Sequence, residues 1–186
     1  MEEFLAKAKA SAQIIATMQS AEKNRVLVEM ADALVAQSGR IITENEKDMR
    51  EGEANGLDSA LLDRLLLDEG RIGGMAQSLR EISQLKEPVG RVLEGWMSED
   101  NLRIEKVSVP IGVIGVIYES RPNVTSDVGA LCFKIGNVAI LKGGKEAEYS
   151  NQIIAEILQE VLEQNSLPKE IISLLPASPR EGVSRL

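Results

Sequence analysis

The sequence has no histidine and only one cysteine, Cys132, among its 186 residues. Histidine is the commonest general base and metal ligand near neutral pH, so zinc chemistry and Ser-His-Asp hydrolysis are poor candidates for this chain. A single cysteine excludes an internal disulfide, which is consistent with a reducing compartment. Because Cys132 lies between Leu131 and Phe133 in a predicted helix, we interpret it as a small core residue and not as a nucleophile.

An excess of basic residues and long apolar runs are also missing. The net charge is −8, whereas nucleic acids and anionic membranes require clustered Lys and Arg, so neither is expected as a partner. No apolar run approaches the roughly 20 residues that cross a bilayer. The acidic start, Met1-Glu2-Glu3, leads into an Ala-rich helix and is typical of neither a signal nor a transit peptide. We therefore expect a cytoplasmic protein.

The hydrophobic fraction of 44% is enough for a core, and the first half of the chain is predicted to be helical. Apolar residues recur at helical spacing from Glu2 to about Leu85. Asp58 and Asp68 are predicted to be N-caps of the last two helices. We expect a helical layer that packs on another part of the protein. The breaks between the earlier helices are predicted at Gln19-Ser20, Ser38-Gly39 and Asn55-Gly56.

A predicted β-hairpin follows this helical half. Residues 91–97 and 102–109 are strand-like, and the turn-rich Ser98-Glu99-Asp100-Asn101 separates them. The second run alternates apolar and polar residues with one slip at Lys106. Because an isolated hairpin is marginal in water, it should lie on another element or another subunit.

From Pro110 onward the pattern is strand, helix, strand, helix, strand, which predicts right-handed crossover units in an open parallel α/β sheet. The first strand is nearly continuous in apolar residues, as in strands buried on both faces of a sheet. A further helix is expected to start near Arg185-Leu186. The predicted strands are 111–118, 138–141 and 171–175, and the predicted helices are 125–134 and 147–164.

Ligands of such sheets bind beyond the carboxyl ends of the strands, and the first strand ends at Glu119-Ser120-Arg121-Pro122-Asn123. The Asn123 amide is suited to stabilising an oxyanion, although Asn is equally a good cap for the following helix. The Arg121 guanidinium has the geometry to grip a substrate carboxylate, or it pairs with Glu119. For Asn123, position alone favours the cap, whereas for Arg121 both alternatives are equally open.

The second strand ends at Lys142-Gly143-Gly144-Lys145. The glycines allow the backbone to approach a ligand closely, and a lysine there can bind ribose hydroxyls or a phosphate. On composition alone an ordinary exposed turn explains the run better. Neither a GxGxxG nor a GxxxxGK[ST] motif is present.

Together these strand ends resemble the gamma-glutamyl phosphate reductases, in the aldehyde dehydrogenase superfamily. The superfamily has a Pro-x-Gly-Val strand that ends in Asn, then a Gly-Asn strand that ends in Lys. The reductase branch is indicated by narrower variants, and the similarity covers essentially the whole chain. These variants are Tyr118-Glu119-Ser120-Arg121-Pro122-Asn123-Val124-Thr125, Leu131-Cys132-Phe133-Lys134-Ile135-Gly136-Asn137 and Lys142-Gly143-Gly144-Lys145-Glu146.

The resemblance implies roles for matching residues. Asn123 would be the oxyanion-stabilising asparagine, and Lys142 would contact the adenosine ribose of NADPH. Gly143, Gly144 and Lys145 would line the same nucleotide edge, and Ser120, Arg121 and Pro122 would belong to the loop beside the nicotinamide and the substrate. Arg121 is our candidate for binding the glutamyl carboxylate. No metal ligand is implied.

The resemblance also implies three parts and a reaction. Residues 1–90 would be helices packed on the nucleotide-binding domain, 91–109 an oligomerisation hairpin, and 110–186 the first part of an NADP-binding, Rossmann-like α/β domain. The implied reaction of proline biosynthesis reduces gamma-glutamyl phosphate to glutamate 5-semialdehyde through a cysteine thiolate. No residue here matches that cysteine, because the family's catalytic domain lies downstream. The alternatives are a non-catalytic nucleotide-binding or assembly fragment, or another aldehyde dehydrogenase.

Overall fold

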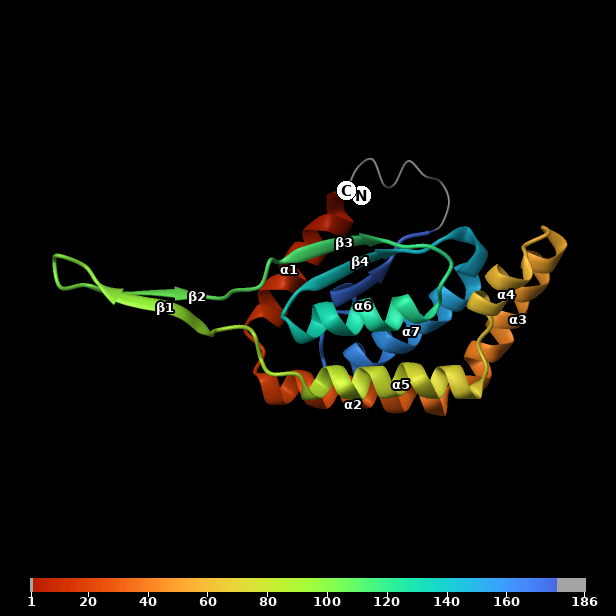
Figure 1. Cartoon of the computed structure of the whole chain (residues 1–186), viewed down its shortest axis with the longest axis horizontal. Coiled ribbons are helices and arrows are strands. Elements are labelled where there is room, and N and C mark those ends of the chain that lie inside the picture. The colour runs from red at the N-terminus through yellow and green to blue at the C-terminus, as the bar shows by residue number, and fades with distance from the viewer. Residues whose placement is uncertain (1, 177–186) are drawn as a thin grey trace.

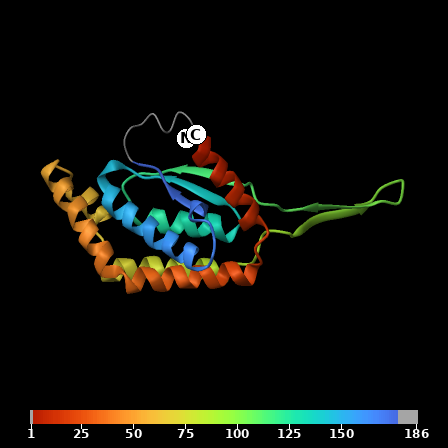
Figure 2. The same cartoon turned by 180° about the vertical axis from the view of Figure 1, so that it is seen from behind.

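The computed structural model describes residues 2–176, which form a layered body with a projecting hairpin (Figure 1). A three-stranded sheet carries one helix on one face and two helices on the other, and a further pair of helices covers those two (Figures 1 and 2). The helix expected near Arg185 lies outside the described residues. None of the helices within 2–176 combines the length and apolar content that a bilayer span requires.

Five helices make up the first half, as the spacing predicts. Asp58 and Asp68 are confirmed as N-caps, because their carboxylates accept from the N–H groups of Leu61 and Arg71. The break predicted at Ser38-Gly39 lies one residue earlier, at Gln37, and Ser38 already belongs to the next helix. The helices are α1 Glu2–Ala16, α2 Ser20–Ala36, α3 Ser38–Ala54, α4 Ser59–Leu65 and α5 Glu69–Gln84.

The hairpin consists of β1 Val92–Met97 and β2 Arg103–Val107, which pair antiparallel. The sequence slip at Lys106 corresponds to a bulge, because the register shifts between Val92 and Glu94. The extra residue, Leu93, lies in β1 and is left unpaired opposite this part of β2. At the root of the hairpin, Glu87 accepts from the N–H of Val89 and pairs with the buried Lys23 at 2.8 Å.

The sheet contains β3 Val113–Ile117, β4 Val138–Lys142 and β5 Ile172–Leu174, all parallel and in the order β3-β4-β5. Two connecting helices, α6 Asn123–Lys134 and α7 Glu148–Gln164, contact each other on one face, and α1 covers the other. Right-handed crossovers between neighbouring parallel strands place successive helices on the same face. The short 3₁₀ turns η1 Lys145–Ala147 and η2 Lys169–Ile171 precede α7 and β5.

The expectation that the first strand is buried on both faces is wrong. β4 is buried along its whole length, but β3 is only partly buried, and its Ile117 side chain is 64% exposed. Among residues 2–176, β3 pairs with β4 alone and is an edge strand of the sheet. An apolar run therefore indicates that a strand is suited to burial, but it does not show whether residues 2–176 cover that strand.

Candidate functional site

The carboxyl ends of β3 and β4 lie at the end of the body opposite the hairpin, facing α3 and α4 (Figure 1). The loop after β4 contains two glycines, which lie close to α7 and to the loop after β3. A Cβ added to Gly143 would lie 2.2 Å from Asn151 Nδ2, and one added to Gly144 would lie 2.8 Å from Ser120 Oγ. Both positions therefore favour glycine, because a larger residue would have to displace these neighbouring polar side chains.

A chain of hydrogen bonds holds this edge from beneath. The Tyr118 hydroxyl lies 2.7 Å from Thr125 Oγ1, and Thr125 Oγ1 donates to Asn151 Oδ1 at 2.8 Å. Since the single hydroxyl proton of Thr125 is used for Asn151, Tyr118 must be the donor in its bond with Thr125. Burial raises the pKa of Tyr118 to about 12, against the smaller opposing effect of the Thr125 hydrogen bond, so the phenol stays neutral and can donate.

A hydrogen bond between Ser120 and Glu146 also joins the two loops that follow β3 and β4. Ser120 Oγ donates to Glu146 Oε2 at 2.6 Å. This hydrogen bond, with help from the charge of Lys145, lowers the pKa of Glu146 below its ordinary value, although partial burial opposes the shift. Glu146 is therefore a carboxylate at neutral pH and fixes the orientation of Ser120.

A hollow of about 230 Å³ lies between the ends of β4 and β5. Its wall consists of Gly143, Gly144 and the first turns of α7, including Asn151, and residues 174–176 close the other side. Lys142 is 6% exposed, and its Nζ donates to the carbonyl oxygen of Pro176 at 2.7 Å. The sequence expectation that Lys142 and the glycines share one ligand edge remains a prediction, and their neighbourhood is consistent with it.

Asn123 does not cap the following helix. Pro122 is the N-cap of α6 and Asn123 is its first residue, and no side chain makes a cap hydrogen bond there. Instead, the exposed Asn123 amide donates through Nδ2 to Asp127 Oδ2 at 3.0 Å. The cap interpretation is therefore wrong, and the amide remains beside a hollow of about 300 Å³ that Asp127, Arg64 and Arg71 also line.

Arg121 lies beside a different hollow, although it is only two residues from Asn123. This second hollow, of about 350 Å³, is walled by Ser120, Arg121 and Glu146 on one side and by α4 on the other. No ion pair joins Arg121 to Glu119 within residues 2–176. The alternative that Arg121 simply pairs with Glu119 is therefore not what the structure shows.

Two residues considered in the sequence analysis stand apart from these hollows. Lys145, a predicted site residue, is exposed and begins the turn η1. Cys132 is buried in the hydrophobic core, and burial raises the pKa of its thiol, which confirms the interpretation as a structural residue. A thiol with a raised pKa is a poor nucleophile at neutral pH.

Several residues of the site were not expected from the sequence. Thr125 and Asn151 support Gly143 from two helices, Glu146 fixes Ser120, and Arg64 comes from α4. The hydroxyl of Thr125, two residues after Asn123, was a detectable signal. Arg64 was not detectable, because nothing local in the sequence places α4 against the strand ends.

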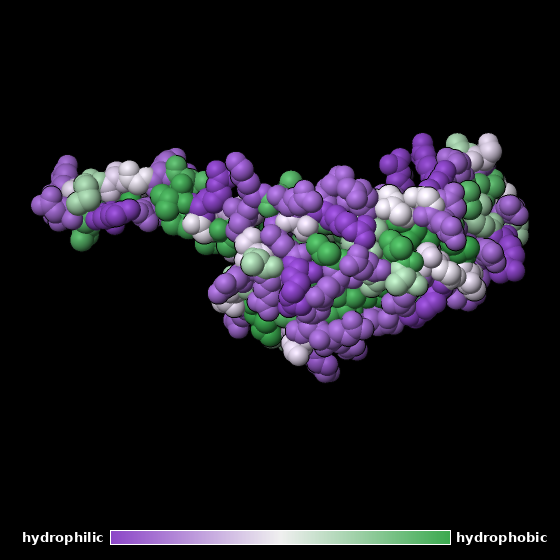
Figure 3. All heavy atoms as spheres, turned by 90° about the horizontal axis from the view of Figure 1, so that it is seen from below, coloured by the Kyte–Doolittle hydropathy of each residue, from purple (hydrophilic) through white to green (hydrophobic). Residues whose placement is uncertain are grey.

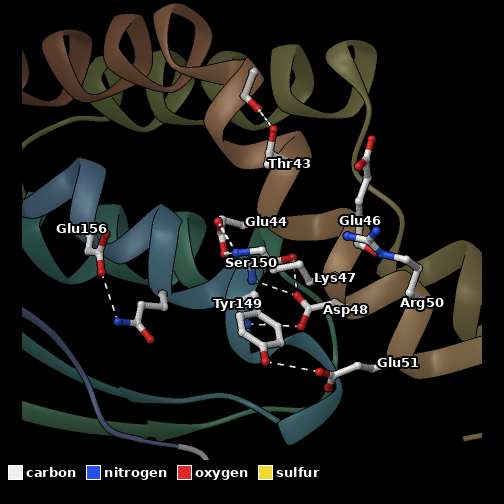
Figure 4. Close-up of polar contacts among 12 residues, drawn as sticks. Thr43, Glu44, Glu46, Lys47, Asp48, Arg50, Glu51, Tyr149, Ser150 and Glu156 are labelled. Carbon is white, nitrogen blue, oxygen red and sulfur yellow. Dashed lines mark hydrogen bonds and ion pairs between the residues drawn. The ribbon is translucent and has the colours of Figure 1, made fainter. Parts of the chain in front are cut away.

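A buried carboxylate attaches α3 to the start of α7, close to the two glycines (Figure 4). Asp48 accepts hydrogen bonds from the backbone N–H groups of Tyr149 and Ser150, the latter at 2.8 Å, and from the Ser150 hydroxyl. A helix start leaves N–H groups without intrahelical partners. A carboxylate accepts hydrogen bonds from them and interacts favourably with the positive end of the helix dipole. Asp48 thus fixes the helix that carries Asn151.

Comparison with known proteins shows which proteins this chain is similar to. No family model matches the chain. The gamma-glutamyl phosphate reductase of Nitratiruptor sp. is 61% identical over 186 residues, which are 100% of this chain and 45% of that protein. The chain thus spans less than half the length of the curated relatives that it matches.

Solved structures give the same result. The gamma-glutamyl phosphate reductase of Thermotoga maritima matches 98% of this chain with 44% of its own, at 34% identity and a TM-score of 0.94. The Saccharomyces cerevisiae reductase matches 95% of this chain with 46% of its own, at 31% identity and a TM-score of 0.88. An acetylating aldehyde dehydrogenase from Geobacillus thermoglucosidasius, at 20% identity and a TM-score of 0.70, shares the fold. Over its whole length, the chain is similar to the N-terminal part of gamma-glutamyl phosphate reductases, and it has the aldehyde dehydrogenase fold.

Proposed function

We propose that this chain is the part of an NADPH-dependent gamma-glutamyl phosphate reductase that holds the nucleotide and positions the acyl group. The observation that carries the proposal is the glycine pair at the end of β4, where a Cβ would collide with Asn151 or Ser120 and the backbone borders a hollow of about 230 Å³. Such close backbone approach beyond the ends of parallel strands is typical of nucleotide sites. The 61% identity to the Nitratiruptor reductase supports the choice of reaction.

The residues of this edge fit a nicotinamide dinucleotide. Lys142 is adjacent to both glycines, Lys145 adds a second positive charge at the rim, and the Ser120–Glu146 pair offers a hydroxyl and a carboxylate to ribose hydroxyls. Bound there, the dinucleotide would supply the reducing equivalent. PnpE, which has the same fold at 20% identity, was solved in complex with nicotinamide adenine dinucleotide. The preference for NADPH rests on the two lysines and on the resemblance to the reductases.

Asn123 is the residue of this chain that we assign to the reacting carbonyl. Its amide nitrogen has two N–H groups, and Asp127 takes one of them. The second N–H remains available to an oxygen on which negative charge develops, and such a donor is worth about 3 kcal/mol in a preorganised site. The cysteine nucleophile of the implied reaction would come from another part of the protein.

The hairpin is assigned to self-association. All residues of β1 and β2 are exposed, and several of them are large and apolar (Figure 3). The hairpin projects from the body, so its apolar side chains contact no other element of residues 2–176 extensively (Figure 1). Because a second copy of the chain would offer the same surface, a symmetric contact would cover it. We assign the protein to the cytoplasm, as its reaction in proline biosynthesis would require.

The test uses a chimeric reductase, in which this chain is joined to the remaining part of the Nitratiruptor relative. We expect NADPH oxidation that depends on gamma-glutamyl phosphate. In the reverse direction, glutamate 5-semialdehyde should be oxidised faster than a panel of unrelated aldehydes. Equal rates across the panel would favour another aldehyde dehydrogenase. Dinucleotide binding without turnover would favour a non-catalytic binding fragment.

A matched pair of glycine variants tests the nucleotide edge directly. Gly143→Ala should raise the dissociation constant for NADPH roughly tenfold or more, because the new Cβ displaces the Asn151 side chain that lines the same hollow. Gly73→Ala is the control, since a Cβ there meets nothing within 4 Å. Unchanged NADPH binding by Gly143→Ala would remove the glycine pair from the nucleotide site.

A further inference from the structure

Two arginines from distant parts of the sequence line the hollow beside the β3 end. Arg64 comes from α4 and Arg121 from the loop after β3, and the hollow between them measures about 350 Å³. Part of its wall is apolar, from Leu57, Leu61 and Leu65. Both arginines are exposed, so water reaches this hollow, and the apolar wall strengthens a charge interaction only where a bound ligand excludes that water.

The side chains of both arginines lack a partner, whereas five of the nine arginines within residues 2–176 pair with carboxylates. No hydrogen bond or ion pair joins the Arg64 or Arg121 side chain to another group within residues 2–176. Five other arginines there pair with carboxylates: Arg25, Arg40, Arg71, Arg80 and Arg103. Arg91 also forms no side-chain bond there, so the feature that distinguishes Arg64 and Arg121 is that they line the same hollow.

The carboxylates of the same hollow do not account for the arginines. Glu146 accepts from Ser120, and Glu119 forms no ion pair with Arg121 within residues 2–176. The two carboxylates balance the two guanidinium charges, so the hollow is not strongly positive as a whole. Recognition of an anion there depends on the fork geometry of the guanidinium groups rather than on net charge.

The position of Arg64 connects three parts of the site. It also lines the hollow that contains Asn123 and Asp127, and Gly144 lines both the Arg64–Arg121 hollow and the hollow between β4 and β5. A ligand that crosses Gly144, or one that extends from Asn123, therefore reaches Arg64.

We propose that Arg64 and Arg121 form one subsite for a carboxylate or phosphate group, with Arg64 as a ligand-binding residue of the reductase. The proposal rests on the proposed function for the identity of the ligands. Two sources carry the required chemistry: the ribose phosphate that distinguishes NADPH from NADH, and the carboxylate of the glutamyl substrate. Each source predicts a different set of binding changes.

The experiment compares Arg64→Ala, Arg121→Ala and Arg50→Ala in the chimeric reductase. Arg50 is exposed on α3 and bonds only the carbonyl of Glu46, which makes it a matched control. Dissociation constants for NADPH and NADH come from fluorescence titration, and the KM for gamma-glutamyl phosphate from initial rates. Loss of a charge-assisted hydrogen bond at such a site should weaken the anionic ligand roughly tenfold or more.

If the ribose phosphate occupies the subsite, Arg64→Ala weakens NADPH but leaves NADH and the substrate KM unchanged. If the substrate carboxylate occupies it, the KM rises and both dinucleotides bind as before. In either case Arg121→Ala should affect the same ligand, and the double variant should be less than additive because both arginines hold one group. The proposal is overturned if Arg64→Ala matches Arg50→Ala within about twofold for all three ligands.

A chimera without turnover would count against the proposed function, but it would still test the subsite. Inorganic phosphate should then raise the thermal midpoint of the parent protein and raise it less in Arg64→Ala. An equal rise in both proteins would contradict the subsite. Arg64→Lys separates charge from geometry, and a fork interaction predicts only partial recovery by lysine.

Discussion

The hairpin and the central strand β4 are built from similar residues but lie in opposite environments. β1 reads VLEGWM and is exposed along its whole length, whereas β4 reads VAILK and is buried along its whole length. The difference is the surroundings, because β4 has a strand on each side and a helix on each face, while β1 has only β2. Apolar composition therefore makes a strand suited to burial, and the neighbouring strands and helices determine whether the strand is buried.

The comparison extends to energetics. Burying an aliphatic or aromatic side chain contributes roughly 1.5–3 kcal/mol, so the body, where helices cover both faces of the sheet, supplies the stability of this chain. The hairpin buries little and is expected to contribute mainly when another surface covers it. Substitutions in the body should therefore change the free energy of unfolding, and substitutions in the hairpin should change association.

The largest effect is expected for Phe133→Ala on α6. Phe133 is fully buried in the core, so its truncation leaves a cavity and should lower the free energy of unfolding by about 3–5 kcal/mol. Denaturant unfolding followed by circular dichroism measures the change. Leu131→Ala is the control on the same helix, because Leu131 is 43% exposed, and it should cost less than about 1 kcal/mol. Similar losses in both variants would mean that α6 does not pack as described.

Most of the body was predictable from the sequence because its signals are local. Asp58 and Asp68 each accept from an N–H three residues ahead, as their cap positions predicted. The exposure of β3 was not predictable, because its apolar run is compatible with either an edge or a central strand. Local patterns specify elements, whereas burial depends on neighbours distant in the sequence.

The second-largest effect is expected for Asp48→Ala. Asp48 is 2% exposed, and its removal leaves two N–H groups at the start of α7 and the Ser150 hydroxyl without their acceptor. The free energy of unfolding should fall by about 2–3 kcal/mol, as measured by denaturant titration. Glu46→Ala, at an exposed position of the same helix, should change it by less than about 0.5 kcal/mol. An Asp48 variant as stable as the Glu46 variant would contradict this role.

A smaller effect should appear at alkaline pH through Tyr118. The folded pKa of about 12 exceeds the ordinary value of 10.0, so between these values the unfolded chain loses the phenolic proton and the folded chain retains it. The free energy of unfolding should therefore fall as pH rises through this window. From about pH 9 to about pH 11, the parent should lose about 1 kcal/mol more than Tyr118→Phe, which has no proton to release. Parallel losses would show that Tyr118 is not buried as described.

The site was only partly predictable, for the same reason as burial. Residues 119–123 and 142–146 were detectable because each set follows one strand, and parallel strands end at the same edge. The division of this edge into separate hollows was not detectable, and it places Arg121 and Asn123 apart although they are two residues apart in sequence. Arg64 enters from α4 through tertiary packing that no local pattern records.

The smallest effect on unfolding is expected for Trp96→Ala in the hairpin, which makes it the sharpest test of the contrast between the two regions. Trp96 is 50% exposed and lies opposite Ile104, so its removal should change the free energy of unfolding of the monomer by about 0.5 kcal/mol or less. If a second copy covers the hairpin, the same change should lower the mass measured by light scattering at concentrations where the parent associates. Lys106→Ala, at an exposed charged position of β2, should leave the mass unchanged. A large loss of monomer stability in Trp96→Ala with an unchanged mass would mean that the hairpin packs on its own body, and the contrast with β4 would not hold.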